Sequence, residues 1–363
     1  MRSFYLVCPL HFEDLVQQEL KYKWPLHFPK DSYNILKADK GGVELECSLE
    51  CGLLLNKILK IPGRIMLRVK KQKCRDLPKL FNIIKKINWK EYLRQENMEI
   101  EVTAKKSRLI HTTKIENTVL DALKAYFMAN KIPQKKILCG AKPQKIYIRL
   151  FEDNLSISLD TSGELLHIRE LNNYRGLASI RETYASALLL YLLGLKSYNK
   201  FTLLDPMCGS ATFLYEAKNF FELNKRSFAF ENWANLSLAT LIDQDNPWSF
   251  SQLQGIDINN QVIQKQENST IKITEGDLFK SQQNHNSIVI LNPPYGKRIK
   301  IEGDLQVYFD SVVKHIQNGI CPHAFGIIIP SAFAKKLKPH KRLKFNQNGI
   351  KVDFLVYLSA RNK

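Results

Sequence analysis

The residues of this sequence with the clearest chemical potential are Asn292, Pro293, Pro294 and Tyr295, which follow a short apolar run at 288–291. Apolar strands rarely end in a polar residue and two prolines, so a rigid polar loop is predicted. Because prolines fix φ and lack N–H donors, the carbonyls of Asn292 and Pro293 and the Asn292 side-chain oxygen can converge on one donor. An exocyclic amino group of a nucleobase is such a donor, and Tyr295 can stack on its ring. A structural proline turn is the alternative interpretation.

A second pattern, at 203–213, is typical of a strand, a tight turn and a helix. Gly209 lets the backbone approach a ligand, Ser210 or Thr212 can cap the helix, and its free N–H groups suit a carboxylate. Asp205 at the strand end can take an ammonium group, directly or through water. The turn therefore suits the zwitterionic end of S-adenosylmethionine (SAM), although an ordinary strand-to-helix connection is the alternative. The expected cofactor contacts are Asp205, Pro206, Cys208, Gly209, Ser210, Ala211, Thr212 and Phe213.

Two more carboxylates follow the next two predicted strands. Asp257, in Gly255-Ile256-Asp257-Ile258, stands where doubly wound folds hold ribose hydroxyls, and Asp277 could accept a hydrogen bond from the adenine amino group. The interval from Asp205 to Asp257 far exceeds the roughly 20 residues of the dinucleotide fingerprint, which argues against NAD and makes 224–251 an insertion. Singly, each acid could be a surface or capping residue, so their order along the strands is the informative part. The expected contacts are Asp257, Ile258, Asp277 and Leu278.

These motifs need a sheet that brings strand ends together. Apolar strands alternating with helices predict an α/β doubly wound, Rossmann-like domain, whose ligands sit at the carboxyl ends of the strands. Asn348-Gly349 between two strand-like runs predicts an antiparallel edge hairpin. The expected strands are 201–204, 253–258, 271–274, 288–291 and 325–329, and the expected helices are 179–193, 212–223 and 305–317.

The first half of the chain predicts an α+β region, and the pattern changes near residue 170. Helices are expected at 12–23, 53–59, 77–87 and 118–128, followed by a basic connector at 131–136, and strands at 43–45, 65–69, 100–104, 145–150 and 155–159.

Charge and composition narrow the class of protein. The formal charge of +19 favours a polyanionic partner such as RNA, and residues 1–160 carry 30 basic against 18 acidic residues. No apolar run approaches the roughly 20 residues of a membrane span, and the first residues do not resemble a secretory signal. Seven scattered cysteines without a C-x-x-C pair favour reduced thiols in the cytoplasm and no metal site. Phosphate contacts are expected at Lys105, Lys106, Arg108, Lys142 and Lys145.

The motifs at 205–213, 255–258 and 292–296, in this order, resemble the THUMP-containing class I RNA methyltransferases, specifically the bacterial group that methylates guanine N2 in 23S ribosomal RNA. The resemblance implies a ferredoxin-like region at 1–60, a THUMP-like RNA-binding domain at 61–165 and a SAM-dependent methyltransferase domain at 166–363. It further implies that the first half grips structured RNA, 23S rRNA or a large-subunit precursor, and delivers a nucleotide to the second half.

The sequence departs from this family at two points. The family usually has glycine where Ala211 stands, and alanine is tolerated there if its φ is negative. The family's helix after Asp257 is also longer, since only 19 residues separate Asp257 from Gly276 here. These departures leave open a non-catalytic RNA-binding or ribosome-assembly protein. A DNA adenine-N6 methyltransferase also stays open, because the Asn-Pro-Pro-Tyr chemistry serves any exocyclic amine and a duplex base could be flipped out.

Overall fold

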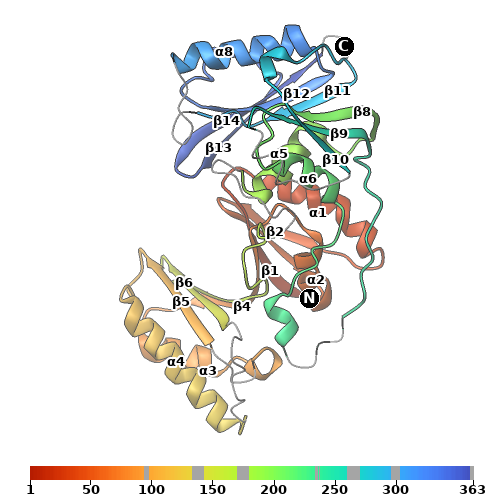
Figure 1. The fold of residues 1–363 in the computed structure, drawn as a ribbon. Coiled ribbons are helices and arrows are strands. Elements are labelled where there is room, and N and C mark those ends of the chain that lie inside the picture. Colours follow the sequence, from red (N-terminus) through yellow and green to blue (C-terminus); the bar gives the residue numbers. More distant parts are fainter. Residues whose placement is uncertain are drawn as a thin grey trace. The chain divides into compact units, whose positions relative to one another are not determined.

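The computed structural model describes residues 1–93, 98–132, 143–169, 180–233, 236, 238–259, 270–295 and 303–359. These form two compact units (Figure 1). Unit 1 comprises Met1–Cys8, Lys23–Leu166 and Asn224–Leu241, and unit 2 comprises Pro9–Tyr22, His167–Leu223 and Ile242–Lys363. Each unit has its own seven-stranded mixed sheet. None of the helices in the described part of the chain has the length and apolar character that a membrane span requires.

The sheet of unit 1 has the order β2-β3-β1-β4-β7-β6-β5. Its neighbouring strands are antiparallel except for the β5–β6 pair. The strands are β1 (Arg2–Val7), β2 (Asn34–Asp39), β3 (Gly42–Cys47), β4 (Arg64–Lys73), β5 (Met98–Lys105), β6 (Gln144–Phe151) and β7 (Asn154–Asp160).

Four helices accompany this first sheet: α1 (Glu13–His27), α2 (Leu49–Ile58), α3 (Leu77–Lys85) and α4 (Thr112–Ala129). Helix α1 contributes residues to both units. The side chains of Ser48 and Asp76 cap α2 and α3, as expected of short polar residues at a helix start. Helix α2 lies close against β1, because a Cβ at Gly52 would fall 2.0 Å from the Phe4 ring. A short 3-10 turn, η1 (Trp89–Glu91), follows α3.

The sheet of unit 2 has the order β10-β9-β8-β11-β12-β14-β13. The first five strands run parallel, and β14 and β13 add antiparallel pairs at one edge. The strands are β8 (Tyr198–Asp205), β9 (Phe250–Asp257), β10 (Ile271–Glu275), β11 (Ser287–Leu291), β12 (Ala324–Pro330), β13 (Lys341–Gln347) and β14 (Ile350–Leu358). The chain leaves β8 toward β9 and β10 and returns to β11 on the other side of β8. This reversal opens a crevice at the carboxyl ends of β8 and β11.

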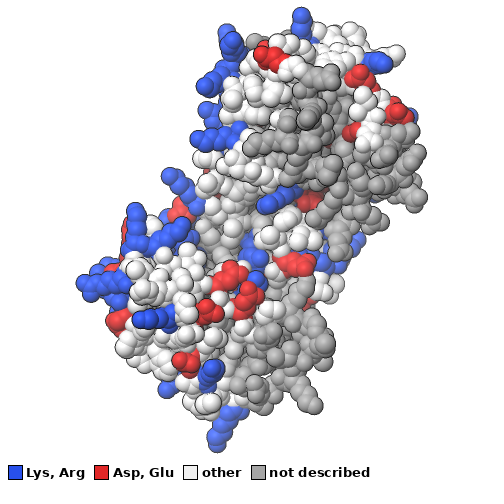
Figure 2. Space-filling model, turned by 60° about the vertical axis from the view of Figure 1, so that its left-hand side comes forward, with Lys and Arg blue, Asp and Glu red and all other residues white. Residues whose placement is uncertain are grey.

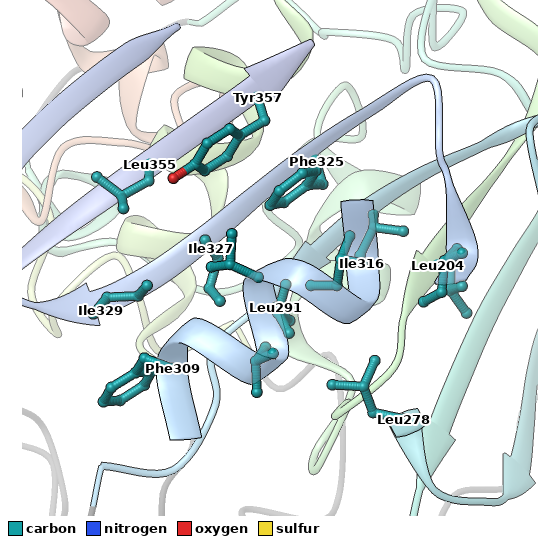
Figure 3. Close-up of a cluster of buried hydrophobic side chains, with 14 of the residues drawn as sticks. Leu204, Leu278, Leu291, Phe309, Ile316, Phe325, Ile327, Ile329, Leu355 and Tyr357 are labelled. Carbon is teal, nitrogen blue, oxygen red and sulfur yellow. The ribbon is translucent and has the colours of Figure 1, made fainter. Parts of the chain in front are cut away.

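Helices cover both faces of the second sheet: α5 (Glu182–Leu193) and α6 (Thr212–Asn219) lie on one face and α8 (Leu305–His315) on the other (Figure 1). The α8 face is a mainly apolar core, in which Phe309 and Ile316 pack with Leu291, Ile327 and Leu355 (Figure 3). Burial of aliphatic and aromatic side chains on this scale is the main stabilising contribution to such a layer. The short turns are η2 (Ala229–Asn232), η3 (Leu278–Lys280) and the π-helical η4 (Ile316–Ile320).

Most elements expected from the sequence are confirmed, with ends shifted by a few residues. The edge hairpin is among them, since Asn348 and Gly349 have φ of 51° and 82° between β13 and β14. Two strands were missed, β1 and β2, and the helix expected at 12–23 continues through Pro25 to His27. The two-sheet α/β architecture is confirmed, whereas the names ferredoxin-like and THUMP-like and the division into three domains stay predictions. The helix after Asp257 lies outside the described residues.

Candidate active site

Three polar side chains meet at the carboxyl edge of the second sheet. Asp205 ends β8, Asp257 ends β9, and Asn292 directly follows β11. The register pairs Val289 with Leu204, so Asn292 stands two residues beyond the level of Asp205 on the neighbouring strand. The crevice created by the chain reversal between β8 and β11 is therefore bordered by Asp205 and Asn292.

The glycine turn and Asp257 are joined directly. Oδ2 of Asp257 accepts a hydrogen bond from the Gly209 N–H at 2.8 Å, and the Cys208 N–H donates to the Ile256 carbonyl at 3.0 Å. Gly209 has a φ of 50°, which glycine adopts without steric cost, and a Cβ there would meet nothing within 4 Å. The turn thus leaves open space beside the backbone at the point where a ligand is expected.

The start of helix α6 differs from the expectation. Its N-cap is Ala211, and no side chain caps the helix, because the hydroxyls of Ser210 and Thr212 lie 3.0 Å from each other instead. The condition under which alanine would be tolerated at 211, a negative φ, is not met, since Ala211 has a φ of 53°. A left-handed alanine costs about 1 kcal/mol, and glycine would remove that strain. A helix start without a capping side chain keeps its positive end available for an anion.

Asp205 is the most strongly perturbed carboxyl of the site. It is 2% exposed and accepts one hydrogen bond, from the Met207 N–H at 3.2 Å. Burial raises its pKa to about 8, and the nearby charge of Asp257 contributes to the rise. No cationic side chain among the described residues pairs with it. An ammonium group placed here would supply the missing positive charge.

Asp257 keeps acceptor capacity free for a ligand. Each of its carboxylate oxygens accepts one backbone N–H, from Gly209 to Oδ2 and from Asn259 to Oδ1 at 2.9 Å. A carboxylate has about four acceptor positions, so two hydroxyl groups can still donate to it. The following Ile258 is 75% exposed. An exposed isoleucine beside a hydroxyl-binding acid suits the apolar face of a nucleoside base.

Asp277 and several other residues expected to contact the cofactor make contacts within the protein itself. Asp277 caps η3 by accepting from the Phe279 N–H at 3.0 Å. The side chains of Cys208, Phe213 and Leu278 are 6%, 2% and 2% exposed, so they pack in the core. Cys208 lies against the neighbouring strand, where a Cβ at Gly255 would fall 2.9 Å from its sulfur. A ligand at this turn would therefore contact these residues mainly through their backbone.

Asn292 carries a buried acceptor without a donor. Its Oδ1 atom is inaccessible to solvent and has no hydrogen-bond partner among the described residues. Such orphaned acceptors are uncommon and call for a water or a ligand. Pro293 is buried and Pro294 half-buried, while Tyr295 packs against the α8 core. Gly296 lies outside the described residues.

The sequence did not predict a group of aromatic side chains that packs against the same core as Tyr295. Tyr308 of α8 donates its hydroxyl hydrogen to the Met207 sulfur at 3.8 Å, and Phe333 packs on Phe309 with ring centroids 5.6 Å apart. Met207 and Tyr308 both pack against the core that Tyr295 contacts. The helical spacing of Leu305, Tyr308, Phe309 and Val312 could have assigned Tyr308 to the inner face of its helix.

The expected phosphate contacts lie in unit 1, and the structure does not gather them into one unpaired patch. Lys145 pairs with Glu99 and Glu101 at 3.1 and 3.0 Å, and Lys106 lies 3.8 Å from Glu152. Lys105 and Arg108 are on the surface near the end of β5, and Lys142 lies outside the described residues. Their role stays a prediction.

The comparisons with known proteins agree with the geometry of unit 2. Residues 169–346 match the RMKL-like methyltransferase domain. Ribosomal RNA large subunit methyltransferase K/L of Colwellia psychrerythraea is 27% identical over 294 residues, which cover 74% of this chain and 41% of that protein. The chain thus spans about two fifths of this relative. The protein slr0064 of Synechocystis sp., provisionally named an RNA methyltransferase, is 27% identical over 329 residues, covering 81% and 82% of the two chains.

A solved structure extends the likeness to the whole fold. SMU.472, provisionally described as a methyltransferase and complexed with SAH, superposes with a TM-score of 0.80 at 21% identity, covering 100% of this chain and 99% of its own. SAH is what remains of SAM after its methyl group has left. At this identity the superposition shows that the two chains share a fold.

Proposed function

We propose that this protein is a SAM-dependent RNA methyltransferase that modifies an exocyclic amino group, namely N2 of a guanine in large-subunit ribosomal RNA. The buried, partnerless Oδ1 of Asn292 carries the proposal. It stands at the carboxyl edge beside Asp205 and Asp257, where the crevice of a doubly wound sheet receives its ligand.

The residues at the strand ends and at the start of α6 suit the separate chemical groups of SAM. The buried carboxyl of Asp205 suits its ammonium group, the uncapped start of α6 its carboxylate, and Asp257 its two ribose hydroxyls. Ile258 offers an apolar contact to adenine, and Asp277 can accept from the adenine amino group. When bound, SAM supplies an activated methyl group on a sulfonium.

Asn292 and Pro293 would hold the amino group that receives the methyl. Their oxygens accept its hydrogens, so the nitrogen lone pair points at the methyl carbon. As the new C–N bond forms and the S–C bond breaks, positive charge grows on nitrogen, and the same oxygens stabilise it. The surplus proton then leaves to water. No strong base is needed, because the protein contributes mainly position and electrostatics.

The choice of ribosomal RNA rests on the named activity of the relatives and on charge. The K/L relative is named for the large-subunit ribosomal RNA, and the formal charge of +19 favours a nucleic acid partner. This proposal includes guanine N2 as the methylated atom, unit 1 as the THUMP-like part that binds the RNA, and a cytoplasmic location. The same Asn-Pro-Pro-Tyr chemistry serves adenine N6 in DNA, and a binding protein without activity would keep the fold.

Product analysis separates these functions. Ribosomal RNA from cells lacking the protein, and duplex DNA, are each incubated with purified protein and methyl-labelled SAM, then digested to nucleosides and analysed by mass spectrometry. We expect N2-methylguanosine from the RNA and no label in the DNA. N6-methyladenine from the DNA, or tight RNA binding without any labelled nucleoside, would contradict the proposal.

A further inference from the structure

The segment that follows β12 is strongly basic. Residues 330–358 contain six lysines and one arginine against a single acid, Asp353. All six lysines are exposed, and Nζ of Lys341 lies 6.0 Å from the centroid of the Tyr191 ring. The other five lie around the turn after β12 and on the edge strands, and we call them the lysine surface: Lys335, Lys336, Lys338, Lys344 and Lys351.

The charges of the lysine surface are not neutralised. Among the described residues no acid forms an ion pair with any of its five members, and Asp353, the one acid within 330–358, is 1% exposed. Two lysines of unit 1, Lys71 and Lys145, are by contrast paired with glutamates at 2.8 and 3.0 Å. A group of exposed lysines without counter-charges attracts polyanions and releases counterions when it binds them.

The lysine surface begins at the same sheet edge as the candidate active site. Strand β12 neighbours β11, with Ile327 level with Leu291, the residue before Asn292. Ser331, the first residue after β12, donates its N–H to the Lys351 carbonyl at 2.9 Å. Lys335, Lys336 and Lys351 therefore lie at or near the carboxyl edge that presents Asn292.

Buried hydrogen bonds hold this basic turn in one conformation. Asp353 accepts from the Ser331 hydroxyl at 2.5 Å and from Nη1 of Arg342 at 2.9 Å. Nη2 of Arg342 donates to the carbonyls of Ala334 and Leu337 at 3.1 and 2.8 Å. The turn is thus fixed before any partner arrives, which lowers the entropy cost of binding.

We propose that the lysine surface binds the phosphate backbone of RNA next to the nucleotide that enters the active site, with Arg342 and Asp353 as positioning residues. The proposal rests on the proposed function for its choice of RNA. Lysine and arginine side chains gather along the left margin of the upper unit in Figure 2. Phosphate contacts there would fix the register of the strand whose base is modified.

Charge neutralisation tests this proposal. A triple variant, Lys335→Gln, Lys336→Gln and Lys351→Gln, is compared with a control of equal charge change, Lys196→Gln, Lys200→Gln and Lys272→Gln. The control lysines are exposed and lie near the amino ends of β8 and β10, at the opposite edge of the same sheet. Affinity for ribosomal RNA from cells lacking the protein is measured without SAM over a range of salt concentrations.

We expect the first triple variant to bind on the order of tenfold more weakly at physiological salt, with the slope of log affinity against log salt reduced by about 2. The control should stay within about twofold of the wild type, and both variants should keep their affinity for SAM. Equal loss in both variants, unchanged binding in the first, or no RNA binding by the wild type would overturn the proposal. Because SAM is absent from the binding assay, an inactive enzyme would refute the proposed function and leave this test intact.

Discussion

Two buried acids, Asp160 of unit 1 and Asp205 of unit 2, have opposite electrostatic surroundings. In unit 1, Asp160 is fully buried but forms an ion pair with Arg64, and Glu44 accepts from Lys71. In unit 2, Asp205 is just as buried and has no cationic partner among the described residues. A buried acid with a cationic partner stabilises the fold, whereas a buried acid without one is a candidate ligand-binding group.

The largest expected effect is the loss of stability on replacing Asp160, the acid paired with Arg64. Asp160→Asn leaves the guanidinium of Arg64, whose side chain is only 14% exposed, without its counter-charge. We expect a loss of about 3 kcal/mol in the free energy of unfolding, measured by denaturant titration. Asp39→Asn, which removes an exposed ion pair with Lys37, should change little. Equal stability of Asp160→Asn and wild type would erase the contrast between Asp160 and Asp205.

The unpaired acid should respond with the opposite sign. The pKa of Asp205 is raised to about 8, from about 4 in the unfolded chain, so the unfolded state loses its proton first. Stability of the ligand-free protein should therefore fall as pH rises from about 4 to about 8. Asp205→Asn should flatten this dependence and add on the order of 2–4 kcal/mol at pH 7, while weakening SAM binding. A variant less stable than wild type at pH 7 would argue against this interpretation.

Replacing Asp257, the acid that we propose binds the ribose, should affect cofactor binding more than folding. If its carboxylate accepts two hydrogen bonds from ribose hydroxyls, Asp257→Ala should bind SAM roughly 10- to 100-fold more weakly by calorimetry. Asp277→Ala, which removes the cap of η3 and the proposed contact to adenine, should have a smaller effect. Equal affinity for SAM in Asp257→Ala and wild type would remove Asp257 from the site.

The smallest expected effect is a change of stability at Ala211, the strained N-cap of α6. Ala211 has a φ of 53°, so Ala211→Gly should stabilise the protein by about 0.5–1 kcal/mol, the strain relieved less the entropy of glycine. Gly209→Ala, with a φ of 50° at the mutated residue, should destabilise by a similar amount. A rise in melting temperature for the first and a fall for the second would check the pair together.

Local chemistry explains what the sequence could predict. The two prolines after β11 and the Asn348-Gly349 turn act through the φ of the residues themselves, so both features were readable without long-range contacts. The order Asp205, Asp257, Asn292 followed from the rule that parallel strands present their carboxyl ends at one edge.

Long-range pairing explains what was missed. β1 has apolar or aromatic residues on both faces, so its alternation of apolar and polar residues is weak. Tyr5, for example, lies under the Arg68 guanidinium on the face away from the core. β2 is mostly exposed and carries almost no apolar pattern. Residues 224–251 were recognised as an insertion, but the grouping of 224–241 with unit 1 depends on contacts such as Asn224 with Lys60 at 2.7 Å. The φ of Ala211 likewise follows from tertiary structure rather than residue type.

The central claim, that the Asn292 oxygen holds the amino group to be methylated, is tested most directly by one pair of variants. Asn292→Ala is compared with Asn286→Ala, which alters an exposed asparagine at the other end of the same strand. Single-turnover methyl transfer to ribosomal RNA and SAM affinity are measured for both. We predict a loss of about 10²–10³ in the transfer rate for Asn292→Ala alone, with SAM affinity unchanged. Transfer by Asn292→Ala at the rate of Asn286→Ala would contradict the account.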